Sequence, residues 1–169
     1  MKTLCLFRHG KSSWSDSSLS DRDRPLNARG QRDVPLMAEQ FQKLDIRPSL
    51  IMASPANRAW STGQLLADQF GYPREFMHRD EPLYLASLKT LLEAISNLDD
   101  SFNNVVLVGH NPGLTELANY FIADLTDNLP TSGFVALKSN SRKWQAFAES
   151  TVELVKFDRP SLHRRQSKI

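Results

Sequence analysis

The chain has 169 residues, of which 40% are hydrophobic and 24% charged, and this size and balance fit one globular domain with a substantial core. Its 21 basic and 19 acidic residues leave a formal charge of only +2, which argues against a dedicated nucleic-acid binder, because such proteins carry a dense basic excess. No apolar run approaches a membrane span, and the chain reaches Arg8 and His9 without the apolar segment of a secretory signal. Cys5 is the only cysteine, so no internal disulfide can form, and we expect a cytoplasmic protein.

Short apolar runs alternate with segments of helical periodicity, which is the pattern of an α/β domain. The continuous apolar run at residues 3–7 predicts a strand that is buried on both faces of a parallel sheet. A polar loop follows at residues 11–24. We expect Asn27 to cap a helical turn and Asp33 to cap its continuation, which would place Pro35 in a first turn, where proline is tolerated.

The middle of the chain continues the alternation of strands and helices. Residues 50–53 predict a short strand, and residues 59–70 predict a helix that ends at Gly71. A brief edge strand is predicted at residues 75–77, and we expect Ser87 to cap a third helix.

The last third of the chain has the clearest strand signal. Residues 104–108 contain a Val-Val-Leu-Val run and predict a buried strand, which a helix follows at residues 114–121. Residues 134–138 and 151–157 are strand-like, and the turn residues 139–142 predict that the two segments form an antiparallel hairpin.

The positive charge is concentrated at the end of the chain. Residues 159–169 hold four basic residues and no acidic one, so residues 1–158 carry a formal charge of about −2. We expect a single domain over residues 1–158 and a basic C-terminal tail, loosely docked or disordered, over residues 159–169. A plain solvated terminus is favoured over an arm for nucleic acid or an acidic partner, because four charges are few.

Polar residues of catalytic type follow three of the predicted strands directly. These segments are residues 6–11 (LFRHGK), residues 51–59 (IMASPANRA) and residues 107–113 (LVGHNPG). In open α/β sheets, ligands bind outside the carboxyl ends of the strands. The three segments would therefore bring four side chains to one face of the domain: Arg8, His9, Arg58 and His110.

Two arginines and two histidines suit a tetrahedral dianion such as a phosphoryl group. Arginine is permanently charged and presents a planar fork to phosphate oxygens. A neutral histidine can attack phosphorus, while a protonated second histidine can donate to a nonbridging oxygen. Each of the four also has an ordinary structural interpretation, as a loop or turn histidine, a surface ion-pair partner or the exposed start of a helix. Their common place at strand ends favours the functional interpretation.

Other residue types with reactive side chains give no comparable pattern. No Cys/His pair has the spacing of a zinc site, and no Walker sequence, dinucleotide-binding fingerprint or nucleophile elbow is present. We expect His78 to be exposed, His163 to lie in the tail, and Cys5 to be a buried, inert thiol.

The Arg8-His9-Gly10 triplet, with Arg58 in Ser-Pro-Ala-x-Arg-Ala and His110 in Gly-His-Asn-Pro-Gly, resembles the histidine phosphatase superfamily. Within that superfamily the chain is similar to the small SixA-type phosphohistidine phosphatases. The resemblance covers about residues 1–157, and four further segments support it: residues 8–14 (RHGKSSW), 23–30 (DRPLNARG), 83–87 (LYLAS) and 130–133 (PTSG).

The resemblance implies a fold and a set of roles. The fold would be a phosphoglycerate mutase-like α/β three-layer sandwich, with a mostly parallel central sheet flanked by helices. His9 would be the nucleophile that takes the phosphoryl group, Arg8 and Arg58 would clamp its nonbridging oxygens, and His110 would stabilise charge in the transition state. Water would then hydrolyse the phosphoenzyme, so no metal and no organic cofactor are expected.

Four further residues receive weaker roles. Glu81 lies three residues before Tyr84, which is the place of a general acid in the wider superfamily. The alternative interpretation is a solvated surface acid, and the sequence favours neither. A leaving imidazole needs less proton donation than a leaving alkoxide, so SixA-like proteins depend less on such an acid. Lys11 and Arg24 are expected to bind substrate at the rim of the pocket. Trp14 either lines the rim or packs under the loop, and packing under the loop is favoured.

The expected function is hydrolysis of protein phosphohistidine through a phospho-His9 intermediate. Only 51 residues separate Arg58 from His110, which leaves little material to cover the pocket, and an open pocket suits a phosphorylated side chain on another protein. The expected partner is thus a phosphotransfer domain, with no nucleic acid and no membrane involved, and we expect a monomer. The alternatives are a phosphatase of small phosphomonoesters and a module that recognises phosphate without turnover.

Overall fold

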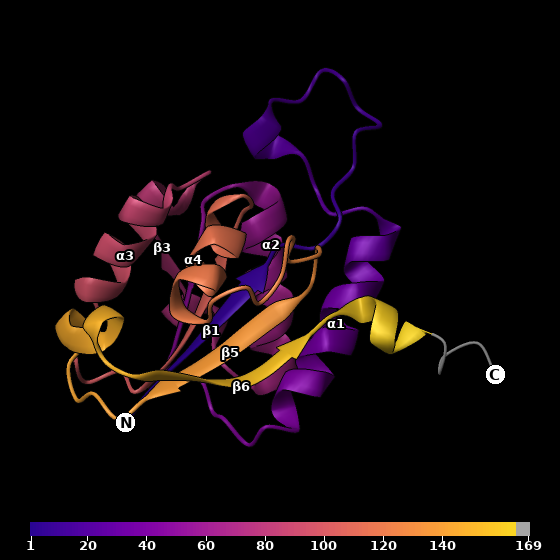
Figure 1. The fold of residues 1–169 in the computed structure, drawn as a ribbon. Coiled ribbons are helices and arrows are strands. Elements are labelled where there is room, and N and C mark those ends of the chain that lie inside the picture. The colour runs from indigo at the N-terminus through magenta and orange to yellow at the C-terminus, as the bar shows by residue number, and fades with distance from the viewer. Residues whose placement is uncertain (165–169) are drawn as a thin grey trace.

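The computed structural model describes residues 1–164 and consists, over those residues, of a six-stranded mixed sheet with helices on both faces (Figure 1). The strands are β1 (Lys2–Arg8), β2 (Leu50–Ala53), β3 (His78–Arg79), β4 (Asn104–Gly109), β5 (Phe134–Ser139) and β6 (Val152–Asp158). The α-helices are α1 (Ala28–Gln42), α2 (Asn57–Phe70), α3 (Leu88–Ser96) and α4 (Gly113–Phe121). Short 3₁₀ helices are η1 (Asp21–Asp23), η2 (Arg74–Phe76), η3 (Glu81–Leu83), η4 (Trp144–Glu149) and η5 (Pro160–Leu162).

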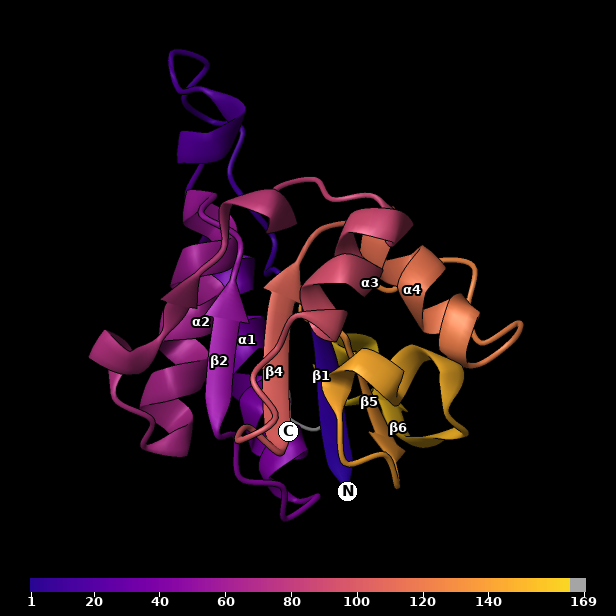
Figure 2. The same ribbon diagram turned by 90° about the vertical axis from the view of Figure 1, so that its left-hand side faces the viewer.

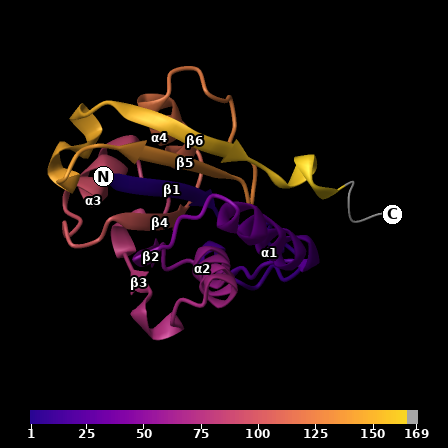
Figure 3. The ribbon, with the colours of Figure 1, turned by 90° about the horizontal axis from the view of Figure 1, so that it is seen from below.

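The strands lie in the order β3-β2-β4-β1-β5-β6, which Figure 3 shows from below. The first four pair in parallel, whereas β5 is antiparallel to β1 and β6 is antiparallel to β5. The expected α/β sandwich, with a mostly parallel central sheet flanked by helices, is confirmed. Since β1 and β4 are parallel neighbours at the centre of the sheet, the segments that follow their carboxyl ends lie close together at one edge of the sheet.

The core has two halves, one on each face of the sheet, as strand alternation requires. Leu4 and Leu6 of β1 face the half that α3, α4 and η4 cover, while Cys5 and Phe7 face the half that α1 and α2 cover. Figures 1 and 2 show the two helix pairs on opposite sides of the strands. Cys5 is fully buried, and burial raises the pKa of its thiol, so the expected inert role fits its environment.

Helix α1 begins where the sequence predicts but is not divided. The Asn27 side chain accepts from the backbone N–H of Gly30, which confirms the predicted cap. The prediction that Asp33 caps a second helix is wrong, because α1 runs unbroken through Asp33 and Pro35. The Asp33 carboxylate is buried and instead accepts from Arg164 Nη2 at 2.8 Å.

Two further predictions need correction. The edge strand predicted at residues 75–77 is wrong, because residues 74–76 form η2 and the strand comes next, as β3. The antiparallel pairing of β5 and β6 is confirmed, but the connection extends well beyond residues 139–142 and contains η4. Trp144 and Phe147 of η4 are fully buried, so this segment contributes to the core rather than forming a simple turn.

The loop at residues 11–27 projects beyond the edge of the sheet toward which β2 and β4 run (Figure 2). Within residues 1–164, no helix is long and apolar enough to span a membrane. Residues 159–164 continue from β6 into η5 and reach Asp33 through Arg164. Arg165 and Lys168 of the predicted basic tail lie outside the described residues.

Candidate active site

His9 follows the last residue of β1 and is buried. Its Nδ1 lies 2.7 Å from the carbonyl oxygen of Gly10, and since a carbonyl can only accept, Nδ1 carries the hydrogen. Burial lowers the pKa of His9 to about 3, so the ring is neutral near pH 7. The neutral ring therefore has its lone pair on Nε2, which is the form that attacks phosphorus.

Thr62 joins the loop after β1 to helix α2. Its Oγ1 accepts from the backbone N–H of Gly10 at 3.0 Å and donates to the carbonyl of Arg58 at 2.7 Å. A Cβ on Gly10 would lie 2.9 Å from a methyl group of Val34 and 3.2 Å from Gly30 Cα. Only glycine therefore lets the loop pack this closely against α1.

The two arginines reach the site from β1 and from the first turn of α2. Arg8 Nη1 donates to the carbonyl of Leu129 at 2.9 Å. Arg58 is buried, and its Nη1 and Nη2 donate to the backbone carbonyl and the carboxylate of Asp21 at 2.6 and 3.0 Å. The Nε atoms of Arg8 and Arg58 are both buried and have no hydrogen-bond partner within residues 1–164.

His110 follows β4, and its ring centroid lies 5.1 Å from that of His9. Its Nε2 lies 2.7 Å from Ser54 Oγ, while its Nδ1 is buried without a partner among the described residues. Burial, followed by the charge of Arg58, lowers the pKa of His110 to about 3. The expected protonated second histidine is thus neutral in the free protein. With Ser54 as donor to Nε2, the neutral ring still presents an Nδ1–H.

These four side chains line one cavity of about 190 Å³. Its lining residues are Arg8, His9, Lys11, Ser12, Trp14, Arg24, Arg58, Leu85, His110, Asn111 and Thr131. The buried polar atoms without partners in residues 1–164 are Arg8 Nε, Arg58 Nε, His110 Nδ1 and Ser132 Oγ. Three of the four belong to this lining. Because Arg8, Arg58, Arg24 and Lys11 line the cavity and no carboxylate does within residues 1–164, the site is suited to receive an anion.

The structure brings Lys11 and Arg24 to the same cavity as the four central residues, but not Glu81. The Glu81 side chain is 65% exposed and pairs with Arg22 Nη2 at 2.8 Å. Arg24 is buried and donates to Ser12 Oγ at 2.8 Å. Trp14 is 74% exposed, so of its two predicted positions the rim is correct.

Three supporting residues were missed in the sequence. Asp21 pairs with both Arg24 and Arg58 and accepts from the Tyr84 hydroxyl. Ser54 orients His110, and Thr62 fixes Gly10. Ser54 opens the Ser-Pro-Ala-x-Arg-Ala motif, which was a usable signal, whereas Asp21 is one of several acids in a polar loop and had none.

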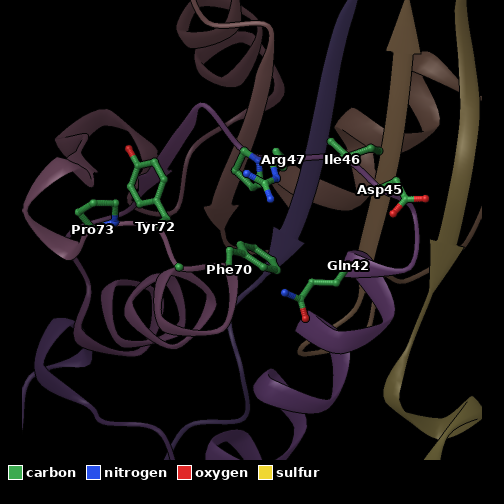
Figure 4. A pocket seen from close by; sticks show the side chains of 9 residues that line it. Gln42, Asp45, Ile46, Arg47, Phe70, Tyr72 and Pro73 are labelled. Atoms are coloured by element: carbon green, nitrogen blue, oxygen red, sulfur yellow. The ribbon is translucent and has the colours of Figure 1, made fainter.

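A larger cavity, of about 670 Å³, lies elsewhere (Figure 4). It is bounded by the end of α1 at Gln42, the end of α2 at Phe70, and the segment around Arg47 that leads into β2. It thus lies at the amino end of β2, away from the carboxyl ends where His9 and the arginines meet. Within residues 1–164, no group of three or more His, Cys, Asp or Glu side chains is arranged to hold a metal ion.

Comparison with known proteins agrees with this fold and places the chain in a family. Residues 4–81 match the family model of the histidine phosphatase superfamily (branch 1). The chain is 31% identical over 157 residues to an uncharacterized protein of Picosynechococcus, an alignment that covers 90% of this chain and 94% of that protein. It is 30% identical over 160 residues to an uncharacterized chloroplastic protein of Arabidopsis thaliana, covering 88% and 72% of the two chains. The chain belongs to the histidine phosphatase superfamily.

Solved structures of SixA proteins have the same fold. A protein of Agrobacterium tumefaciens, provisionally assigned as the phosphohistidine phosphatase SixA, is 27% identical with a TM-score of 0.80, covering 94% of this chain and 98% of that chain. A protein histidine phosphatase SixA in complex with tungstate is 18% identical with a TM-score of 0.79, covering 95% and 98%. The expected phosphoglycerate mutase-like architecture is therefore confirmed.

Proposed function

We propose that this protein hydrolyses phosphohistidine on a phosphotransfer protein through a phospho-His9 intermediate. The observation that carries the proposal is that His9, with its lone pair on Nε2, shares one small cavity with the guanidinium groups of Arg8 and Arg58 and with the ring of His110. A nucleophile and an anion site in one cavity are what phosphoryl transfer to a histidine requires.

The reaction has two steps. His9 Nε2 attacks phosphorus, the N–P bond of the substrate breaks, and the leaving imidazole takes a proton from water. The guanidinium groups of Arg8 and Arg58 and the ring of His110 bind the nonbridging oxygens throughout. A water molecule then attacks phospho-His9, which releases inorganic phosphate and restores the lone pair on Nε2.

The absence of a well-placed acid supports phosphohistidine over phosphomonoesters. Among the described residues, the cavity lining contains no Asp or Glu. Glu81 points to Arg22 at the surface, and Asp21 is ionised, because the hydrogen bond from Tyr84 and the pairing with Arg58 lower its pKa to about 2. An alkoxide leaving group depends on a well-placed side-chain acid more than imidazole does, and the imidazole here takes its proton from water.

Rapid chemical quench with a histidine-phosphorylated phosphotransfer protein tests the proposal. The wild-type protein is expected to accumulate acid-labile phosphate on His9, and a folded His9→Asn variant is expected to accumulate none and to lose turnover. Full turnover by His9→Asn would refute the mechanism. A strong preference for sugar or nucleotide phosphates would instead identify a small-molecule phosphatase, and tight binding without phosphate release would identify a recognition module.

A further inference from the structure

The mouth of the candidate active site carries two exposed apolar side chains. Trp14 is 74% exposed and Leu85 is 55% exposed, and both line the cavity that contains His9 and His110. Trp14 comes from the loop after β1, and Leu85 comes from the turn between η3 and α3. We call these two side chains the apolar rim. An exposed apolar side chain lacks the favourable free energy that burial would give it. Two such side chains at one cavity mouth therefore indicate a surface that binds a partner.

Leu85 has a backbone conformation that its side chain does not favour. Its φ is 48°, in the left-handed region where glycine or asparagine is the usual residue. A turn that needed only this conformation would be served better by glycine. Strained residues of this kind concentrate at functional sites, and here the strain holds a leucine at the mouth of the cavity.

Trp14 is held in place rather than free in solvent. The guanidinium of Arg24 lies 3.4 Å from the centroid of the indole ring. Arg24 is itself fixed, because it donates to Ser12 Oγ at 2.8 Å and to the carboxylate of Asp21 at 3.0 Å. An exposed tryptophan on a rigid support loses little conformational entropy when it is covered, which is the property of an anchor in a protein interface.

The short length of a phosphohistidine side chain determines which surface lies against the apolar rim. His9 is buried in a small cavity, and its Nε2 must touch the phosphorus atom. A histidine side chain is short, so the backbone of a protein that presents phosphohistidine must come close to the mouth of the cavity. The surface around that phosphohistidine then lies against the side chains that line the mouth.

We propose that the apolar rim is the docking surface for the phosphohistidine-carrying protein, which contacts Trp14 and Leu85 through apolar side chains flanking its phosphohistidine. This inference rests on the proposed function. The phosphoryl dianion complements the guanidinium groups of Arg8 and Arg58 inside the cavity, and an apolar collar around the histidine complements the rim. A free small phosphate compound fills the cavity without needing the rim.

The test compares two substrates, a histidine-phosphorylated phosphotransfer protein and phosphoimidazole, in Trp14→Ala and Leu85→Gly. Glycine removes the leucine side chain and also relieves the left-handed backbone strain, so this variant is expected to fold. Each variant is expected to lower the ratio of kcat/KM for the protein to kcat/KM for phosphoimidazole about tenfold, through KM for the protein.

Two exposed apolar residues away from the cavity provide matched controls. Leu162 is 55% exposed, as Leu85 is, and Phe76 is 65% exposed, so Leu162→Ala and Phe76→Ala are expected to leave the ratio unchanged. If the wild-type protein turns over both substrates but the ratio is unchanged in the rim variants, docking at the rim is refuted alone. If the wild-type protein turns over phosphoimidazole or phosphomonoesters but not the phosphoprotein, both proposals are refuted.

Discussion

The hydroxyl of Ser54 and the Nε2 of His110 lie 2.7 Å apart, beside the buried ring of His9. Ser54 Oγ also accepts from the backbone N–H of Ala56 at 3.3 Å, so its own proton is free to be donated to the ring. That arrangement places the proton of neutral His110 on Nδ1, the atom that lacks a partner. A residue outside the cavity lining thus determines which hydrogen-bonding atom His110 presents to the substrate.

Ser54→Ala is expected to lower kcat roughly tenfold, because His110 Nε2 is left buried without a partner and the position of its proton is no longer fixed. The measurement is steady-state kinetics with the phosphoprotein, together with the imidazole proton resonances of His110. Ser61→Ala removes a hydroxyl that donates to Asn57 on the exposed side of α2 and has no contact with His110 within residues 1–164, so it is the matched control. An unchanged kcat would show that Ser54 does not orient His110.

Asp21→Asn is expected to raise KM for the phosphorylated substrate about fivefold, because Arg58 and Arg24 lose a charged hydrogen-bond acceptor that fixes their side chains. Asparagine keeps the shape of the side chain, so the change isolates the charge. Asp23→Asn serves as the control, since within residues 1–164 the Asp23 carboxylate accepts from the Ser20 hydroxyl and from no arginine. Equal values of KM in the two variants would contradict a positioning role for Asp21.

Thr62→Val keeps the volume of the side chain but removes the hydroxyl that binds Gly10 and Arg58. The backbone N–H of Gly10 would then be buried without a partner, and the expected loss in the free energy of unfolding is about 1–3 kcal/mol. Urea unfolding measures this loss. Thr62→Ser restores the hydroxyl and is expected to recover most of the stability, and a failure to do so would point to packing instead.

Glu81→Gln tests whether proton donation by Glu81 matters. We expect kcat/KM for the phosphoprotein to change less than about twofold, because Glu81 is an exposed partner of Arg22 and imidazole needs little help to leave. Glu149→Gln, at the end of η4, controls for the general effect of removing a negative charge. A fall in phosphohistidine turnover of about a hundredfold or more would establish Glu81 as a general acid.

The stability of the protein is expected to decrease with acid because of two buried histidines. Burial lowers the pKa of both His9 and His110 from 6.5 to about 3. In the unfolded chain the two histidines become protonated near pH 6.5, whereas in the folded protein they become protonated only near pH 3. The stabilisation is therefore present above pH 6.5 and is lost progressively as the pH falls toward 3. Within this window the free energy of unfolding should fall by about 1.4 kcal/mol per pH unit for each histidine.

Urea unfolding at a series of pH values measures that slope, and His9→Asn is expected to reduce it by about half, since one of the two histidines is removed. His78 is exposed, so His78→Asn is expected to leave the slope unchanged. Equal slopes in the wild-type protein and in His9→Asn would contradict the assignment.

The sequence predicted the elements whose signals are local. The Val-Val-Leu-Val run became β4, and the caps at Asn27 and Ser87 begin α1 and α3 as expected. The errors came from residues whose environment is set by distant parts of the chain. Asp33 has the sequence signal of a cap, but a buried carboxylate with an arginine partner 131 positions away explains its presence within a helix.

The same distinction applies to the candidate site. The four central residues lie at the ends of buried strands or at the start of a helix, so their convergence could be inferred from the order of the strands. These residues are Arg8, His9, Arg58 and His110. Asp21 begins the short 3₁₀ helix η1 within the polar loop after β1, and no local sequence pattern indicates that its carboxylate meets Arg58. Which atoms remain without a partner is likewise a three-dimensional property.

The ion pair between Asp33 and Arg164 joins the last described residue of the chain to α1. Helix α1 in turn supports the loop that carries His9. Gly30 lies one turn before Asp33 on α1 and is, with Val34 and Leu26, one of the residues against which Gly10 packs. Removing Arg164 would leave the Asp33 carboxylate with Arg29 and Arg32, each at 3.5 Å, as its remaining ionic neighbours. An interior charge with weaker compensation would loosen α1 behind the catalytic loop. A chain shortened to end just after β6 would lose Arg164 and would therefore disturb the surroundings of His9, even though that position is distant in sequence.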